Sequence, residues 1–108
     1  MRPQTFIDTD ELRRSMSGPA PPLVVSVASA AEHRSVRIPG SRRLDDLARF
    51  VREVPRDRPI VVSCRSRGSL TASWARRMLV EHGYHDVRVH TGGLRAWEAA
   101  GLPIVTER

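Results

Sequence analysis

The chain has 108 residues, a length suited to one hydrophobic core, and we expect a single domain over residues 1–108. Its formal net charge of +6 comes from 18 arginines and no lysine against 12 carboxylates, which excludes Schiff-base chemistry and a lysine general base. The single cysteine, Cys64, excludes an internal disulfide and a cysteine-rich zinc site.

Charge and targeting signals also restrict the expected setting and partners. The N-terminal sequence MRPQTFIDTDEL turns acidic before a signal-type apolar run could form, and no apolar stretch reaches membrane-span length. We therefore expect a soluble protein in a reducing, cytoplasmic compartment, with no membrane partner. The arginines are spread along the chain without interleaved aromatics, so no nucleic-acid partner is expected. The positive charge favours an anionic small molecule or an acidic protein.

Apolar strand-like runs and helical spacings alternate along the chain. Residues 10–12 are predicted to open a short helix, and LVVSV at 23–27 is predicted to be a strand because it is apolar and β-branched. Glu32 is expected to cap or order the helix after this strand. The alternation continues with a helix, a strand, a helix, a strand and a helix, at residues 44–54, 60–64, 72–80, 87–90 and 94–100. This order predicts an α/β fold with an open, mostly parallel sheet and helices on both faces.

The stretch IVVSCRSRGSLT places Cys64 where a predicted strand ends and a predicted helix follows. Ligands of open α/β sheets bind beyond the carboxyl ends of the strands, near helix N-termini. Arg65 and Arg67 would favour the reactive thiolate of Cys64. Small residues that would let backbone amides converge on an anion complete the loop: Ser66, Gly68 and Ser69. Cys64 could equally be the buried last residue of the strand, but the loop favours a nucleophile.

Four segments carry a resemblance to a known family. They are LVVSV followed by Glu32 and RIPG (37–40), RPIVVSCRS (58–66), Gly83-Tyr84 with Val87, and GGLRAWEAAGLP (92–103). Together they resemble the single-domain rhodanese family of sulfurtransferases, whose closing motif GGxxAWxxAGLP is matched closely. The resemblance extends over essentially the whole chain and implies the rhodanese-like α/β fold.

The resemblance also implies a chemistry. Cys64 would be the catalytic residue that takes a sulfane sulfur from a small anionic donor such as thiosulfate and holds it as a persulfide. The sulfur would then pass to cyanide, a thiol or a protein acceptor. Arg65 and Arg67 would bind the anion, and the backbone amides of residues 65–69 would hold the persulfide. No metal and no organic cofactor is expected.

Departures from the family pattern keep two alternatives open. Ser26-Val27-Ala28 stands where the family usually has Asp-Val-Arg, and Arg37 stands where it has histidine. Ser69 replaces the arginine that usually ends the loop, which motivates a non-catalytic rhodanese-like module that binds a partner or senses redox state. The spacing from Cys64 to Gly83 is about two positions longer than the family pattern, so either the loop or the following helix is extended, and related phosphatases and arsenate reductases use a longer loop that accommodates a tetrahedral oxyanion. Their loops end in arginine, whereas this chain has Leu70.

Three further side chains are given expected places. Trp97 is predicted to pack the last helix against the sheet, as a large aromatic on an apolar helix face. Trp74 is expected either to wall the pocket or to fill the core. Among the four histidines, His90 is expected to lie nearest the pocket, because it ends the third predicted strand.

Overall fold

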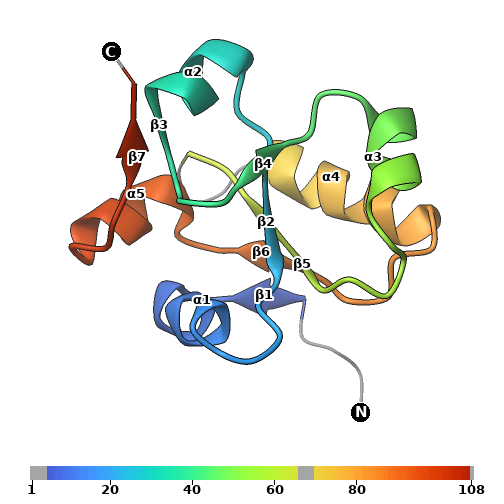
Figure 1. Cartoon of the computed structure of the whole chain (residues 1–108), viewed down its shortest axis with the longest axis horizontal. Coiled ribbons are helices and arrows are strands. Elements are labelled where there is room, and N and C mark those ends of the chain that lie inside the picture. The colour runs from blue at the N-terminus through green and yellow to red at the C-terminus, as the bar shows by residue number, and fades with distance from the viewer. Residues whose placement is uncertain (1–4, 66–69, 108) are drawn as a thin grey trace.

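A five-stranded parallel sheet forms the centre of the computed structural model, which describes residues 5–65 and 70–107 (Figure 1). The strand order is β1-β6-β5-β2-β4, and each neighbouring pair is parallel. Their bounds are β1 Phe6–Ile7, β2 Leu23–Ser26, β4 Arg42–Arg43, β5 Ile60–Ser63 and β6 Val87–His90. A separate antiparallel ribbon pairs β3 (Val36–Arg37) with β7 (Val105–Thr106). The prediction of an open, mostly parallel sheet is confirmed.

Helices cover both faces of this sheet, as predicted (Figure 1). One core cluster joins Phe50 of α3 and Leu79 of α4 to the strands, and the other joins Leu12 of α1 and Trp97 of α5 to the opposite face. The helices are α1 Thr9–Met16, α2 Ala30–Ser35, α3 Leu47–Glu53, α4 Leu70–Glu81 and α5 Gly93–Ala99. No helix within residues 5–65 and 70–107 combines the length and apolar character needed to cross a bilayer.

The central strand β5 is buried along its whole length. Val61 and Val62 point to opposite core clusters, because successive side chains of a strand face opposite sides of the sheet. The apolar run IVV therefore fills both layers, which explains why it shows no polar alternation. The parallel register aligns Ser26 of β2 with Ser63 of β5, so both strands deliver their carboxyl ends to one edge.

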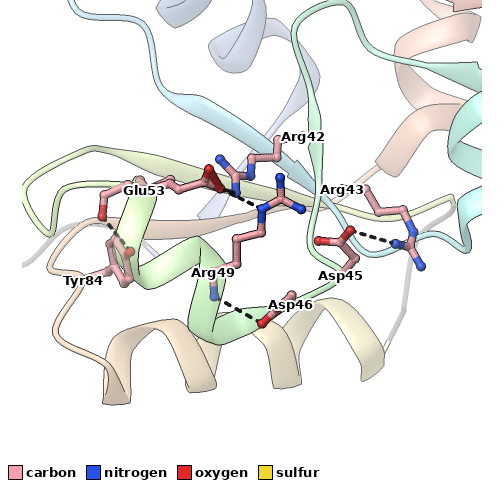
Figure 2. Close-up of polar contacts among 8 residues, drawn as sticks. Arg42, Arg43, Asp45, Asp46, Arg49, Glu53 and Tyr84 are labelled. Carbon is pink, nitrogen blue, oxygen red and sulfur yellow. Dashed lines mark hydrogen bonds and ion pairs between the residues drawn. The ribbon is translucent and has the colours of Figure 1, made fainter.

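The helix predicted from residue 44 begins later, at Leu47. Leu44 matches the helical spacing of its neighbours, but its amide donates to the carbonyl of Ser26 at 2.9 Å and continues the pairing of β4 with β2. The Asp46 carboxylate accepts a hydrogen bond from the Arg49 amide at 3.2 Å and caps the helix there (Figure 2). The predicted start was wrong because a tertiary strand contact outweighs the local periodicity.

Ion pairs tie β4 to α3 on the surface of the sheet edge. Glu53 pairs with Arg42 and, at 3.4 Å, with Arg49, while Arg43 lies 3.7 Å from the Asp45 carboxylate (Figure 2). The Tyr84 hydroxyl donates to the carbonyl of Val54 at 2.8 Å and closes the end of α3. These contacts hold the segment that pairs with the outer side of β2.

The two tryptophans, Trp97 and Trp74, differ in how deeply they are buried. Trp97 is 4% exposed and its indole N–H donates to the carbonyl of Pro103 at 2.7 Å, so its predicted packing role is confirmed. Trp74 is 64% exposed, so it does not fill the core. The reason is that α4 turns its small buried residues, Ala72 and Ala75, toward the sheet and leaves Trp74 on the solvent face.

Candidate functional site

A pocket of about 260 Å³ lies at the carboxyl ends of β2 and β5. It is bounded by the ends of these two strands, by α2 and β3, and by the first turn of α5. The described residues that line it are Val24, Ser26, Ala28, Ala31, Glu32, Ser35, Val36, Arg37, Ile38, Ser41, Ser63, Cys64, Arg65 and Leu94. Trp74 is not among them, so the expectation that it walls the pocket is also wrong.

Cys64 follows β5 directly and lines this pocket while being only 9% exposed. Its carbonyl accepts a hydrogen bond from the Leu94 amide at 2.8 Å, and the Arg65 carbonyl accepts one from the Arg95 amide at 3.0 Å. The first amides of a helix lack partners within the helix and are usually satisfied by a capping side chain. Gly92, at the N-cap of α5, supplies none. The backbone around Cys64 therefore takes the place of a cap, and α5 holds the backbone of Cys64 in position.

Arg65 reaches from the residue after Cys64 to α2. Its guanidinium donates to the Glu32 carboxylate at 3.1 Å, with both side chains largely exposed. Glu32 also forms a capping box with Ser29, which confirms its predicted role at the start of α2. Hydrogen bonds with Ser29, followed by the contact with Arg65, lower the pKa of the Glu32 carboxyl. The carboxylate is thus charged at neutral pH and faces the arginine beside Cys64.

Arg37 contributes a second guanidinium to the pocket wall. It donates to the carbonyls of His33 and Arg34, both at 3.3 Å, which end α2, and to the Glu107 carboxylate at 3.2 Å. The side chain is 23% exposed. Arg37 therefore closes the C-terminal end of α2 and joins it to Glu107, the residue after β7, so its charge already has structural partners.

The structure brings Cys64 and Arg65 to the same pocket, as the sequence predicts. Ser66, Arg67, Gly68 and Ser69, the other residues of the predicted anion-binding loop, lie outside the described residues. The backbone cradle expected for a bound anion stays a prediction. Within residues 5–65 and 70–107, no group of three or more histidine, cysteine or acidic side chains is placed to hold a metal ion.

Several pocket residues were not identified from the sequence. Ser63, Ile38 and Leu94 lie in segments that carry the family resemblance, but neither they nor Ser41 were given a place in the site. Adjacent parallel strands present their carboxyl ends together, so the rule that ligands bind at this edge could have indicated Ser63 beside Cys64. The positions of Ile38 and Ser41 depend on the course of the chain after α2, for which the sequence offers no periodic signal.

His90 lies behind the pocket and is fully buried. Its ring joins Thr9 through Nε2 at 2.8 Å and the Ser63 hydroxyl through Nδ1 at 3.2 Å. Among the described residues, His90 is not part of the pocket lining. It contacts the lining residue Ser63 from behind, so its predicted place in the pocket is corrected. Burial lowers the pKa of His90 to about 4, against a smaller opposing effect of Asp8. The imidazole is therefore neutral at physiological pH.

Acidification is expected to destabilise the fold through His90. The folded state resists protonation until about pH 4, whereas an unfolded histidine gains a proton near its ordinary value of 6.5. The unfolded state therefore binds more protons between these values, and the free energy of unfolding should fall by up to about 3 kcal/mol as pH decreases through this window. Urea unfolding of wild type and His90→Gln as a function of pH measures the effect. The stability gap between them should narrow in acid, and parallel pH profiles would contradict the prediction.

Comparisons with known proteins agree with this geometry. The Rhodanese-like domain family model matches residues 8–100. A protein named sulfurtransferase from Allochromatium vinosum is 33% identical over 101 residues, 92% of each chain. A thiosulfate sulfurtransferase GlpE from Pseudoalteromonas translucida is 32% identical over 80 residues, covering 72% of this chain and 74% of that protein. The solution structure of the rhodanese-like domain of the Anabaena sp. Alr3790 protein has a TM-score of 0.85 at 23% identity, over 96% of this chain and 80% of that one, and shares the fold.

Proposed function

The chain belongs to the rhodanese-like domain family, and from this premise we propose that it is a sulfurtransferase that carries sulfane sulfur as a persulfide on Cys64. The observation that carries the proposal is the position of Cys64, the single cysteine, on a pocket at the carboxyl edge of the sheet beside an arginine. The similarity to proteins named sulfurtransferase supports the same activity.

The proposed reaction needs only the thiolate and an anionic donor. The Cys64 thiolate attacks the outer sulfur of thiosulfate, a new S–S bond forms, and the S–S bond of the donor breaks with its electron pair leaving on sulfite. The product is a persulfide anion on Cys64. A nucleophilic acceptor, cyanide or a thiolate, then attacks the terminal sulfur, and the electron pair of the broken bond returns to Cys64 as thiolate.

Loading of the wild-type protein tests this proposal. Incubation with thiosulfate should raise the intact mass by one sulfur atom, and subsequent addition of cyanide should restore the original mass. If the folded protein stays unmodified with thiosulfate and with organic persulfide donors, the carrier role is wrong. The non-catalytic binding or redox-sensing module would then be the better hypothesis.

Phosphate chemistry receives less support from the described residues. Leu70, at the place where related phosphatases have an arginine, opens α4 with an alkyl side chain that is 85% exposed. An alkyl group offers no donor to a phosphate oxygen. If the wild-type protein hydrolysed an aryl phosphate and Cys64→Ser did not, phosphate chemistry would be supported instead.

Arg65 is expected to act in donor capture. Replacing it by methionine keeps an unbranched apolar stem and removes the charge, so the KM for thiosulfate should rise by about three- to tenfold with little change in kcat. The free energy of unfolding should change by less than about 1 kcal/mol, because the Arg65–Glu32 ion pair is exposed to solvent.

A matched variant separates this effect from the loss of any positive charge. Arg52 is an exposed arginine of α3 that is not among the described pocket residues. Arg52→Met should leave the KM within about twofold of wild type at physiological ionic strength, because salt screens distant exposed charges. Equal effects of the two variants, measured by steady-state sulfite release, would show that Arg65 acts only through net charge.

A further inference from the structure

The pocket beside Cys64 is larger than an inorganic sulfur anion needs. Its volume is about 260 Å³, whereas a cavity of about 150 Å³ is sufficient to hold benzene. Thiosulfate is a compact ion no bulkier than benzene. Drug-sized ligands occupy pockets of about 300–1,000 Å³, so this pocket suits a ligand of one ring with a few further atoms.

The lining of the pocket is mostly apolar. Val24 comes from β2, Ile38 from the turn after β3 and Leu94 from the first turn of α5, and each presents alkyl surface to the space. Ser26 and Ala28, two positions at which the chain departs from the rhodanese pattern, are short and uncharged, and both line it. An inorganic dianion gains nothing from alkyl walls, while an apolar group gains the free energy of leaving water.

The two arginines among the described lining residues already pair with carboxylates. Arg65 pairs with Glu32 and Arg37 pairs with Glu107. The two guanidinium groups can attract one anionic sulfur, but each is partly neutralised, so the described lining offers moderate positive charge beside a larger apolar surface. The combination of a sulfur nucleophile, moderate positive charge and an alkyl wall describes a site for an amphipathic thiolate.

We propose that the sulfur acceptor is a small organic thiol whose apolar group, about the size of one aromatic ring, occupies this pocket. The inference rests on the proposed function, because it names the substrate class of the same site. The acceptor thiolate attacks the terminal sulfur of the Cys64 persulfide, and a new S–S bond forms on the acceptor. The bond to Cys64 breaks with its electron pair remaining as the Cys64 thiolate, so the products are an organic persulfide and the free enzyme.

Discharge of sulfur-loaded protein by thiols of similar acidity tests the proposal. Benzyl mercaptan carries the ring, 2-mercaptoethanol does not, and cyanide is a small acceptor that needs no pocket. At equal concentrations below saturation, benzyl mercaptan should discharge the wild-type persulfide at least about tenfold faster than 2-mercaptoethanol, because filling an apolar pocket gives discrimination of this size. Similar rates for the two thiols would overturn the inference.

Substitutions at two neighbouring positions test whether the preference for benzyl mercaptan arises in this pocket. Ala31 lines the pocket from α2, whereas Ala30, the preceding residue of the same helix, is not among the described lining residues, and both are exposed. Ala31→Leu should reduce the preference for benzyl mercaptan to less than about threefold by filling the pocket. Ala30→Leu should retain the full preference. A preference that survives in Ala31→Leu would also overturn the inference.

Binding of a ligand without sulfur distinguishes failure of this inference from failure of the proposed function. Phenylacetate has the ring and one negative charge, and its binding to unloaded protein can be followed by NMR. It should bind wild type and Cys64→Ser alike and bind Ala31→Leu about tenfold more weakly. If the protein never loads sulfur, this pattern would still support the ligand class while the carrier function fails. Absence of phenylacetate binding, or equal binding to Ala31→Leu, would overturn the inference whatever the loading result.

Discussion

Replacement of Cys64 by serine is expected to abolish sulfur loading completely. The chain has one cysteine, so no second thiol can accept the sulfur, and a serine hydroxyl is not ionised at neutral pH. Intact-mass measurement after incubation with thiosulfate should show a gain of one sulfur for wild type and none for the variant. A gain that persists in Cys64→Ser would mean that the sulfur is not carried as a cysteine persulfide.

Stability measurements separate a chemical effect of the Cys64 substitution from an effect on folding. Cys64 is nearly buried, so a substitution there can also affect the fold. Cys64→Ala is a second variant without a thiol and should show the same loss of loading. If both variants give cooperative urea unfolding and native circular dichroism, the loss reports on chemistry and not on folding.

Replacement of Gly92 by alanine is expected to damage both the fold and the site. A Cβ at Gly92 would lie 2.2 Å from the Cβ of Ala96, far inside van der Waals contact, so the backbone must move. We expect a loss of about 3 kcal/mol in the free energy of unfolding. The displaced first turn of α5 holds the carbonyl of Cys64 through the Leu94 amide, so the rate of sulfur loading should fall as well.

A second substitution should relieve this clash. In Gly92→Ala with Ala96→Gly the colliding methyl group is absent, and the remaining cost should be about 1 kcal/mol, the usual cost of glycine in a helix. Gly18→Ala is the matched control, because its Cβ would meet only ordinary contacts from 3.4 Å and should change stability by less than about 1 kcal/mol. Failure of the double variant to regain stability would show that the steric explanation is wrong.

Much of the fold could be predicted because its main elements carry local signals. The strands β2 and β5 contain apolar, β-branched runs, β6 alternates valine with polar residues, and α4 combines helical spacing with Gly83, whose φ of +97° suits glycine after a helix. Elements without such signals were missed. Two-residue strands such as β1 and β7 are too short to show a period and exist only through their partners, β6 and β3.

The candidate site also contains residues that the sequence indicated and residues that it did not. Cys64 and Arg65 were identified from a strand followed by an arginine- and hydroxyl-rich loop, and the structure places both on one pocket. Ile38 and Leu94 lie in segments that carried the family resemblance, but their meeting in the pocket wall was not predicted, because these segments are distant in the sequence. The burial of His90 and its contact with Ser63, 27 residues away, likewise follow from the pairing of elements and not from any pattern around either residue.

The sequence alone indicated Cys64 as the candidate nucleophile, because it is the single cysteine and ends an apolar strand before a loop of arginines and hydroxyls, while sulfur transfer was implied by the family resemblance. Only the tertiary structure decided what surrounds that sulfur. Parallel pairing brings the ends of β2 and β5 together, α5 anchors the backbone at Cys64, and alkyl side chains from distant segments form the wall. Local propensity acts between residues a few positions apart and leaves a period in the sequence, whereas packing between distant elements depends on shape and burial and leaves none.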